Sequence, residues 1–316
     1  MNMDKAAFES FKQQGYNRIP VVREVLADTD TPLSTYLKLA KGPHSYFFES
    51  IQGGEKWGRF SIIGLPCSTV LRVVGERLTV ERDGEVIESL ETADPFAFIE
   101  EYRARFRVAE VTDNQRFGGG LVGYFAYDTV RYVEPSIGPA KDAGALDTPD
   151  ILLMLSEEVV VFDNLRGTIA FVITVDPTDD NAFERAQARI DALQNQLGAA
   201  APLPPLPQQR GIADGDFVSH FDQADFEAAV ERIKDYIVAG DVMQVVISQR
   251  MSIEFGGDPL NVYRALRYLN PSPYMVFFDL GDHHVVSASP EILARVEQGR
   301  STVLPLAGTR KRGATE

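Results

Sequence analysis

The chain has 316 residues, 44% of them hydrophobic and 24% charged, with 31 lysines and arginines against 46 aspartates and glutamates. This composition predicts a soluble globular protein of about two domains, and it excludes disordered and collagen-like chains. A formal net charge of −15 at pH 7 repels phosphate backbones and anionic lipid. We therefore expect neither a nucleic acid nor a membrane as partner.

Cysteine usage and the lengths of the apolar runs favour the cytoplasm. Cys67 is the single cysteine, so one chain can form neither a disulfide nor a thiolate metal site, which suits a reducing compartment. We expect it to be a small buried residue. Residues 1–15 lack the apolar run of a signal peptide, and stretches such as 151–155 have the length of a strand rather than of a membrane span.

Before residue 199 the pattern predicts helices and strands in mixed order. Helices are expected at 4–14, 31–42, 94–106 and 181–197, with Thr31 and Asp94 as N-caps before proline. Strands are expected at 45–51, 60–63, 69–74, 77–82, 85–88, 151–155, 159–162 and 168–175. The pair Asp83-Gly84 is typical of a two-residue hairpin turn.

A proline-rich stretch then divides the chain. Residues 199–216 read AAAPLPPLPQQRGIADGD, which is typical of an exposed, semi-extended connector. We predict an N-terminal domain at 1–200, a linker at 201–216 and the first part of a second domain at 217–316. The glycine-rich, basic end of the sequence suggests the front part of a longer chain.

The second part of the sequence also predicts helices and strands in mixed order. Phe226, Val230, Ile233 and Ile237 form one apolar stripe of a helix, and Ala239-Gly240-Asp241 leads into a long strand at 242–255. A helix at about 259–269 and strands at 274–280, 283–289 and 292–296 follow. The predicted fold class is α+β, with antiparallel β-sheets packed with outer helices in two interleaved domains.

Two motifs do not carry chemistry. Residues 118–123 match G-x-G-x-x-G, but a polar segment precedes them and a strand-like run follows, so tightly packed strand backbone is favoured over dinucleotide binding. His283 and His284 are adjacent on a predicted strand and point to opposite faces. They cannot chelate one ion together, and we predict no histidine metal site.

Two other segments leave alternatives open. The run 242–250 is apolar yet carries Gln244, Ser248 and Arg250, which fits either a polar strand end or a strand that presents donors to a polar ligand. The loop 307–312 combines glycine, threonine and three cations, and suits a carboxylate ligand. A basic surface turn would have the same composition.

Several segments in a consistent order resemble the large subunits of anthranilate synthases, in the family of chorismate-utilising enzymes. The second part carries AGDVMQVV (239–246), NPSPYM (270–275), SPE (289–291) and PLAGTR (305–310). The first part carries FES (48–50), GRFSIIG (58–64) and GLVGY (120–124). The resemblance covers the chain from about residue 16 onward.

The resemblance implies a lyase that converts chorismate and ammonia to anthranilate and pyruvate, the first step of tryptophan biosynthesis. It implies a glutamine amidotransferase subunit that supplies the ammonia, a heterotetramer, and allosteric feedback inhibition by tryptophan. It also implies Mg2+ as cofactor, with its ligands and a catalytic histidine beyond residue 316. We therefore assign no metal ligand within the chain and expect the 316 residues alone to be inactive.

Two positions favour this branch of the family. Relatives that add water to chorismate carry a lysine base where this sequence has Gln244, and an amide cannot accept a proton at neutral pH. Aminodeoxychorismate synthases carry a nucleophilic lysine where this sequence has Ala307. The alternatives are an aminodeoxychorismate synthase component I and a non-catalytic tryptophan-binding fragment.

The resemblance also implies site residues. Gln244 and Thr309 are the catalytic candidates, and Gly308 and Thr309 are expected to contact chorismate. The allosteric tryptophan site is expected at Glu49, Ser50, Pro273, Tyr274 and Met275. The chemistry of these residues fits that use, because a polar pair ends the run 45–51 and prolines stiffen the opposite wall, whose aromatic and thioether surfaces suit an indole.

Overall fold

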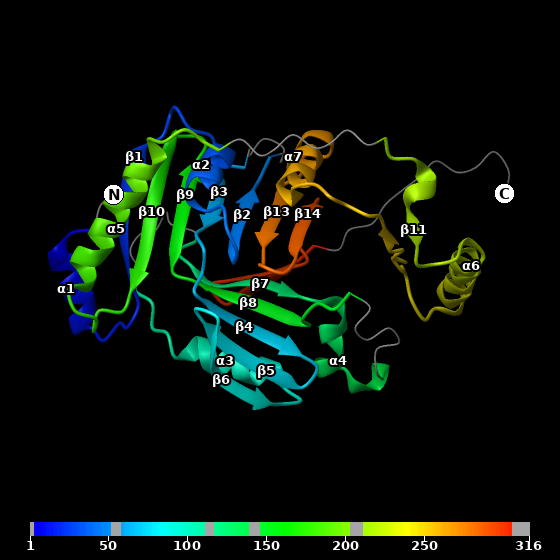
Figure 1. Ribbon diagram of the computed structural model, residues 1–316. Helices are drawn as coiled ribbons and strands as arrows, with labels where there is room; N and C mark the ends of the chain where they lie inside the picture. Colours follow the sequence, from blue (N-terminus) through cyan, green and yellow to red (C-terminus); the bar gives the residue numbers. More distant parts are fainter. Residues whose placement is uncertain (1–2, 52–57, 111–116, 139–145, 203–210, 305–316) are drawn as a thin grey trace. The chain divides into compact units, whose positions relative to one another are not determined.

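The computed structural model describes residues 3–51, 58–110, 117–138, 146–202 and 211–304. Packing divides the chain into two compact units, one formed by Met1–Leu203 with Val262–Glu316 and the other by Pro204–Asn261 (Figure 1). Described residues from 262 onward therefore belong to the same unit as the N-terminal two hundred residues. The domain division at 1–200, 201–216 and 217–316 stays a prediction.

The first unit contains a seven-stranded sheet. Its strands are β1 (Ile19–Leu26), β2 (Ser45–Glu49), β3 (Phe60–Gly64), β9 (Glu158–Asp163), β10 (Thr168–Val175), β13 (Tyr274–Asp279) and β14 (His284–Ser289). They lie in the order β1-β10-β9-β3-β2-β13-β14, and all neighbours are antiparallel. Strands from the two ends of the sequence thus meet at the β2–β13 pair.

A five-stranded antiparallel sheet belongs to the same unit. Its strands are β4 (Thr69–Val74), β5 (Arg77–Arg82), β6 (Glu85–Glu91), β7 (Gly120–Phe125) and β8 (Ile151–Ser156). They lie in the order β6-β5-β4-β8-β7. The turn between β5 and β6 is formed by Asp83 and Gly84, both at positive φ, as the two-residue hairpin signal predicts.

The two sheets share an apolar core. Tyr46 and Phe278 of the first sheet pack with Val70, Leu152 and Met154 of the second. Phe48 packs against the same cluster, while Phe47 faces the opposite side of β2, as its position next to Phe48 in an alternating strand predicts.

Helices cover the remaining faces. Phe98, Ile99 and Tyr102 of α3 (Pro95–Ala104) pack on the outer face of the five-stranded sheet. On the seven-stranded sheet, α1 (Lys5–Gln13) packs against β1, and α5 (Ala182–Leu197) packs against β1, β10 and α2 (Pro32–Leu39) (Figure 1). The caps expected at Thr31 and Asp94 are confirmed, since each side chain accepts a backbone N–H of its helix.

The glycine-rich motif at 118–123 forms strand rather than a phosphate loop. Residues 120–125 are β7, at one edge of the five-stranded sheet. A Cβ at Gly123 would lie 1.8 Å from the carbonyl oxygen of Leu152 on β8, so no side chain fits there. The prediction of tightly packed strand backbone is confirmed.

The second unit differs from the sequence-based prediction at residues 242–255. Its helix α6 (Gln223–Ala239) ends at the predicted turn, where Gly240 adopts the left-handed conformation. The predicted long strand at 242–255 is wrong, because only β12 (Met251–Ser252) pairs there, with β11 (Val218–Ser219). In the described part of the chain residues 242–250 have no partner strand, and apolar pattern alone cannot satisfy a ladder of backbone N–H and C=O groups.

The described residues also contain α4 (Val130–Val133) and the hairpin formed by β15 (Ala294–Glu297) and β16 (Arg300–Val303). Three short 3-10 helices lie at Tyr127–Thr129, Pro135–Ile137 and Asp214–Asp216. Within the described ranges no helix has both the length and the apolar character needed to cross a bilayer. The fold is α+β with antiparallel sheets and outer helices, as predicted.

Candidate functional site

The end of the β2–β13 pair gathers the residues predicted to bind tryptophan. Glu49, the last residue of β2, lies opposite Met275 in the ladder. Beyond it, the N–H of Ile51 donates to the carbonyl oxygen of Ser272 at 3.1 Å. The pairing therefore brings Glu49 and Ser50 alongside the segment that contains Pro273, Tyr274 and Met275.

Strand alternation distributes these residues over two faces of the sheet. Glu49 and Met275 share the face of Phe47 and Phe277, which carries the helices, and both are buried. Tyr274 has the opposite parity and is half-buried. The candidate site is therefore the end of a strand pair rather than one face of it.

Glu49 is a buried carboxylate with two partners on one helix. Only 5% of the residue is exposed. Its Oε2 accepts a hydrogen bond of 2.7 Å from the hydroxyl of Tyr263 and one of 2.8 Å from Nε of Arg267. Oε1 accepts a third, of 3.2 Å, from Nη2 of Arg267. The arginine thus forms a bidentate pair with both carboxylate oxygens, the geometry in which a guanidinium binds a carboxylate most strongly.

These partners belong to α7 (Pro259–Leu269), whose residues from 262 onward lie in the first unit. Tyr263 is fully buried, and its ring lies 5.4 Å from that of Phe47 and 5.8 Å from that of Phe277, measured between centroids. Tyr36 of α2 stacks on Phe47 at 5.5 Å. The aromatic packing fixes Tyr263 under Glu49.

The electrostatics of the cluster keep both donors protonated. Burial, and then the negative charge of Glu49, raise the pKa of Tyr263 far above its ordinary value. Burial alone would lower the pKa of Arg267, but its hydrogen bonds to Glu49 and the charge of that carboxylate leave it raised. Glu49 therefore keeps its hydrogen-bond donors across the physiological pH range.

Ser50 lies against the backbone of Gly58, the first residue of the segment GRFSIIG. A Cβ placed on Gly58 would lie 2.1 Å from both Cβ and the carbonyl oxygen of Ser50, so this position admits only glycine. The carbonyl oxygen of Gly58 accepts a hydrogen bond of 3.2 Å from Nδ2 of Asn164. Nδ2 of Asn164 also donates to Oγ of Ser61 at 3.1 Å. One side of Ser50 is thereby closed.

The predicted catalytic residues are described less completely. Gln244 is exposed, lies outside helix and strand, and belongs to the second unit. Gly308 and Thr309 lie outside the described residues. Their contacts with chorismate stay a prediction.

The implied Mg2+ finds no ligand set in the ranges that the structure describes. No three side chains among histidine, cysteine, aspartate and glutamate come together there in a way that could hold a metal ion. These residues therefore do not fit the group, and none is assigned to it.

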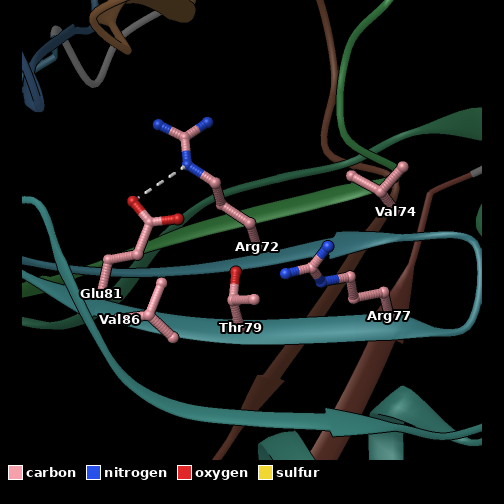
Figure 2. Close-up of a pocket in the computed structure, with 6 residues that line it drawn as sticks. All are labelled: Arg72, Val74, Arg77, Thr79, Glu81 and Val86. Atoms are coloured by element: carbon pink, nitrogen blue, oxygen red, sulfur yellow. Dashed lines mark ion pairs between the residues drawn. The ribbon is translucent and has the colours of Figure 1, made fainter.

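A shallow hollow lies elsewhere in the first unit, on strands β4, β5 and β6. Figure 2 shows its lining residues: Arg72, Val74, Arg77, Thr79, Glu81 and Val86. Nε of Arg72 lies 3.7 Å from a carboxylate oxygen of Glu81, and Nη1 lies 3.6 Å from one of Asp282. No predicted site residue lines this hollow, and we assign it no function.

Sequence reasoning missed Tyr263 and Arg267. A usable signal was present, because the two residues are four positions apart on one helix that leads directly into the segment NPSPYM. The glutamate at the end of the apolar run SYFFE also requires a hydrogen-bond donor or a positive charge beside it if that run is buried. Neither signal reveals which residues pair with each other, since the partners lie more than two hundred positions apart in the sequence.

Comparison with known proteins gives a consistent result. Residues 47–316 match the family described as chorismate binding enzyme. The chain is 54% identical over 321 residues to "Anthranilate synthase component 1" of Pseudomonas aeruginosa and 48% identical over 316 residues to the protein of the same name in Neisseria gonorrhoeae. Each alignment covers 99% of this chain and 64% of the relative. The chain thus spans a little under two thirds of the length of these curated relatives.

A solved structure is similar as well. The crystal structure of anthranilate synthase component I from Streptococcus pneumoniae superposes with a TM-score of 0.60 at 28% sequence identity. The match covers 87% of this chain and 59% of that one. The similarity extends over most of the described fold.

Proposed function

The chain belongs to the family of chorismate-binding enzymes, and within that family we propose that it forms the large subunit of an anthranilate synthase. The observation that carries the proposal is the 54% identity to an anthranilate synthase component 1 over 99% of the chain. In this proposal residues 1–200 form the regulatory domain and residues 217–316 begin the chorismate-binding domain. The proposed location is the cytoplasm.

The proposed reaction consumes one chorismate and one ammonia. Ammonia adds at C2 of the ring while the C4 hydroxyl leaves as water. The enolpyruvyl group is then eliminated as pyruvate, and the ring becomes aromatic. One anthranilate, one pyruvate and one water result. Mg2+ is the proposed cofactor, but the described residues supply no ligand set for it and no step is assigned to it.

Gln244 and Ala307 support the choice of ammonia as nucleophile. An amide at 244 cannot deprotonate water, and alanine at 307 cannot attack the ring. In the proposed site Thr309 donates its hydroxyl to an oxygen of chorismate, and Gly308 lets the backbone approach the substrate closely.

The state of Cys67 supports an external source of ammonia. Burial raises the pKa of its thiol to about 12, so the thiolate needed to attack glutamine is scarce at neutral pH. It is the single cysteine of these 316 residues, which therefore hold no other thiol for a glutaminase. We propose a glutamine amidotransferase subunit as partner, in a heterotetramer.

Tryptophan is the proposed inhibitor. The paired ends of β2 and β13 place Glu49 and Ser50 beside Pro273, Tyr274 and Met275. The half-buried Tyr274 and the buried Met275 have aromatic and thioether side chains that suit an indole, while the polar pair suits the amino-acid end. The proximity of the two segments is what supports this site.

The product of the complete open reading frame that encodes this chain tests the proposal. With chorismate, Mg2+ and ammonium it should form fluorescent anthranilate and an equal amount of pyruvate. The 316-residue chain assayed in parallel is expected to form none. Aminodeoxychorismate as the product would identify the first alternative, and tryptophan binding without any turnover of chorismate would identify the second.

A further inference from the structure

The partners of Glu49 must supply hydrogen bonds and a positive charge as well as packing. A carboxylate this deeply buried is costly unless it is hydrogen-bonded and its charge is compensated. Arg267 supplies the charge and two hydrogen bonds, and Tyr263 supplies a third. Both come from α7, so one helix fixes the direction of this carboxylate and compensates its charge.

We propose that Arg267 and Tyr263 are positioning residues of the tryptophan site, which hold the ionised Glu49 where it can accept the ammonium group of the amino acid. This inference rests on the proposed function, because it concerns the same inhibitor. It adds two residues that touch Glu49 and act through it.

The bonding pattern leaves one acceptor position of the carboxylate unused among the described residues. Oε2 accepts two of the three hydrogen bonds, and Oε1 accepts only the longer one from Nη2 of Arg267 among the described residues. A carboxylate oxygen can accept two. The free acceptor position on Oε1 therefore suits one N–H of an ammonium group.

The same contacts also fix the opposite wall of the site. Helix α7 ends where the N–H of Asn270 donates to the carbonyl oxygen of Leu266, and the chain then runs through Ser272 into β13. Since Arg267 lies in the last turn, its ion pair with Glu49 ties the start of this segment to the end of β2. Loss of the pair should loosen both walls together.

Tryptophan affinity measured by calorimetry on the purified chain tests the proposal without requiring turnover. Arg267→Gln should raise the dissociation constant about tenfold or more, and Tyr263→Phe about threefold, because each removes a donor to a buried charge. Arg267→Lys should recover part of the loss.

The matched controls are Tyr268→Phe on the same helix, whose tyrosine is 85% exposed, and Arg103→Gln on α3, an exposed arginine paired with Glu100. Both should bind like the unsubstituted chain.

A double substitution distinguishes a positioning role of Arg267 from a purely structural one. Glu49→Gln combined with Arg267→Gln removes the unpaired buried charge and should recover the melting temperature lost in Arg267→Gln, but not the affinity. Unchanged affinity in Arg267→Gln, or recovery of affinity in the double variant, would overturn the inference while the proposed inhibition stands. No binding by the unsubstituted chain would instead overturn the proposed tryptophan site and this inference with it.

Discussion

The hydroxyl of Tyr46 lies 2.9 Å from Oγ of Ser156, and this contact joins the two sheets of the first unit. Tyr46 belongs to β2 of the seven-stranded sheet and Ser156 ends β8 of the five-stranded sheet. Both residues are buried in an otherwise apolar interface. Burial raises the pKa of Tyr46 far above its ordinary value, so the phenol stays protonated.

Removal of this hydroxyl should weaken the unit. Tyr46→Phe removes the hydrogen bond between Tyr46 and the buried hydroxyl of Ser156, and the free energy of unfolding should fall by about 1–3 kcal/mol. Urea unfolding followed by circular dichroism measures the change. Tyr127→Phe is the control, because Tyr127 is 91% exposed and its change should stay within about 0.5 kcal/mol. Equal midpoints for both variants would contradict the prediction.

Asp163 should make the fold sensitive to acid. Its Oδ2 accepts from Nε and Nη2 of Arg59 at 3.0 and 2.7 Å, and Oδ1 accepts from the N–H groups of Leu165 and Arg166. Burial alone would raise the pKa of Asp163, but these hydrogen bonds outweigh it and lower the pKa below its ordinary value. A lowered carboxyl pKa stabilises the fold above the unfolded value, and the contribution is lost as pH falls through the folded one.

The expected result is a stability that declines below about pH 5, and less steeply in Asp163→Asn than in the unsubstituted chain. Unfolding midpoints in urea between about pH 3 and 6 measure this. Asp83→Asn serves as the control, since Asp83 is exposed in the β5–β6 turn. Parallel pH profiles for Asp163→Asn and the unsubstituted chain would show that the pair with Arg59 is not the cause.

Cys67 should resist thiol reagents in the folded protein. The residue is half-buried rather than fully buried as predicted. Desolvation of its thiol raises the pKa to about 12, and Sγ donates to the carbonyl oxygen of Leu65 at 3.4 Å. Since the thiolate is the reactive species, a disulfide reagent at about pH 8 should react slowly in native buffer and rapidly in guanidinium. Stoichiometric labelling within seconds before unfolding would contradict this.

Local signals predicted many of the elements. The caps at Thr31 and Asp94 and the turn at Asp83-Gly84 depend on neighbouring residues alone, and all three form. Alternation likewise separated Phe47 from Phe48. Each of these features satisfies its backbone groups or buries its side chains with little help from distant parts of the chain.

Non-local pairings account for what sequence reasoning could not supply. The run 242–250 has the composition of a strand, but a strand also requires a partner, which composition does not reveal. The partners of Glu49 lie 214 and 218 positions away on α7. A buried glutamate demands a donor, yet its sequence neighbours do not say which one.

Thr309 is the first position to test in the chorismate site. Thr309→Ala removes one hydrogen bond to a charged oxygen of the substrate, which should cost about 1.5–3 kcal/mol of transition-state stabilisation. In the product of the complete open reading frame, kcat/KM for chorismate should fall roughly ten- to a hundredfold. The measurement is the initial rate of anthranilate formation across chorismate concentrations. An unchanged kcat/KM would remove Thr309 from the site.

Ser50 tests the tryptophan site most directly. Because the backbone of Gly58 closes one side of Ser50, a phenyl ring at position 50 has to take up space beside the proposed ligand. Ser50→Phe should therefore relieve inhibition by tryptophan and leave uninhibited turnover nearly intact. Anthranilate formation against tryptophan concentration measures this in the product of the complete open reading frame. Ser136→Phe, at an exposed serine, is the matched control and should retain the inhibition curve of the unsubstituted enzyme. If Ser50→Phe retains that curve as well, Ser50 does not line the site.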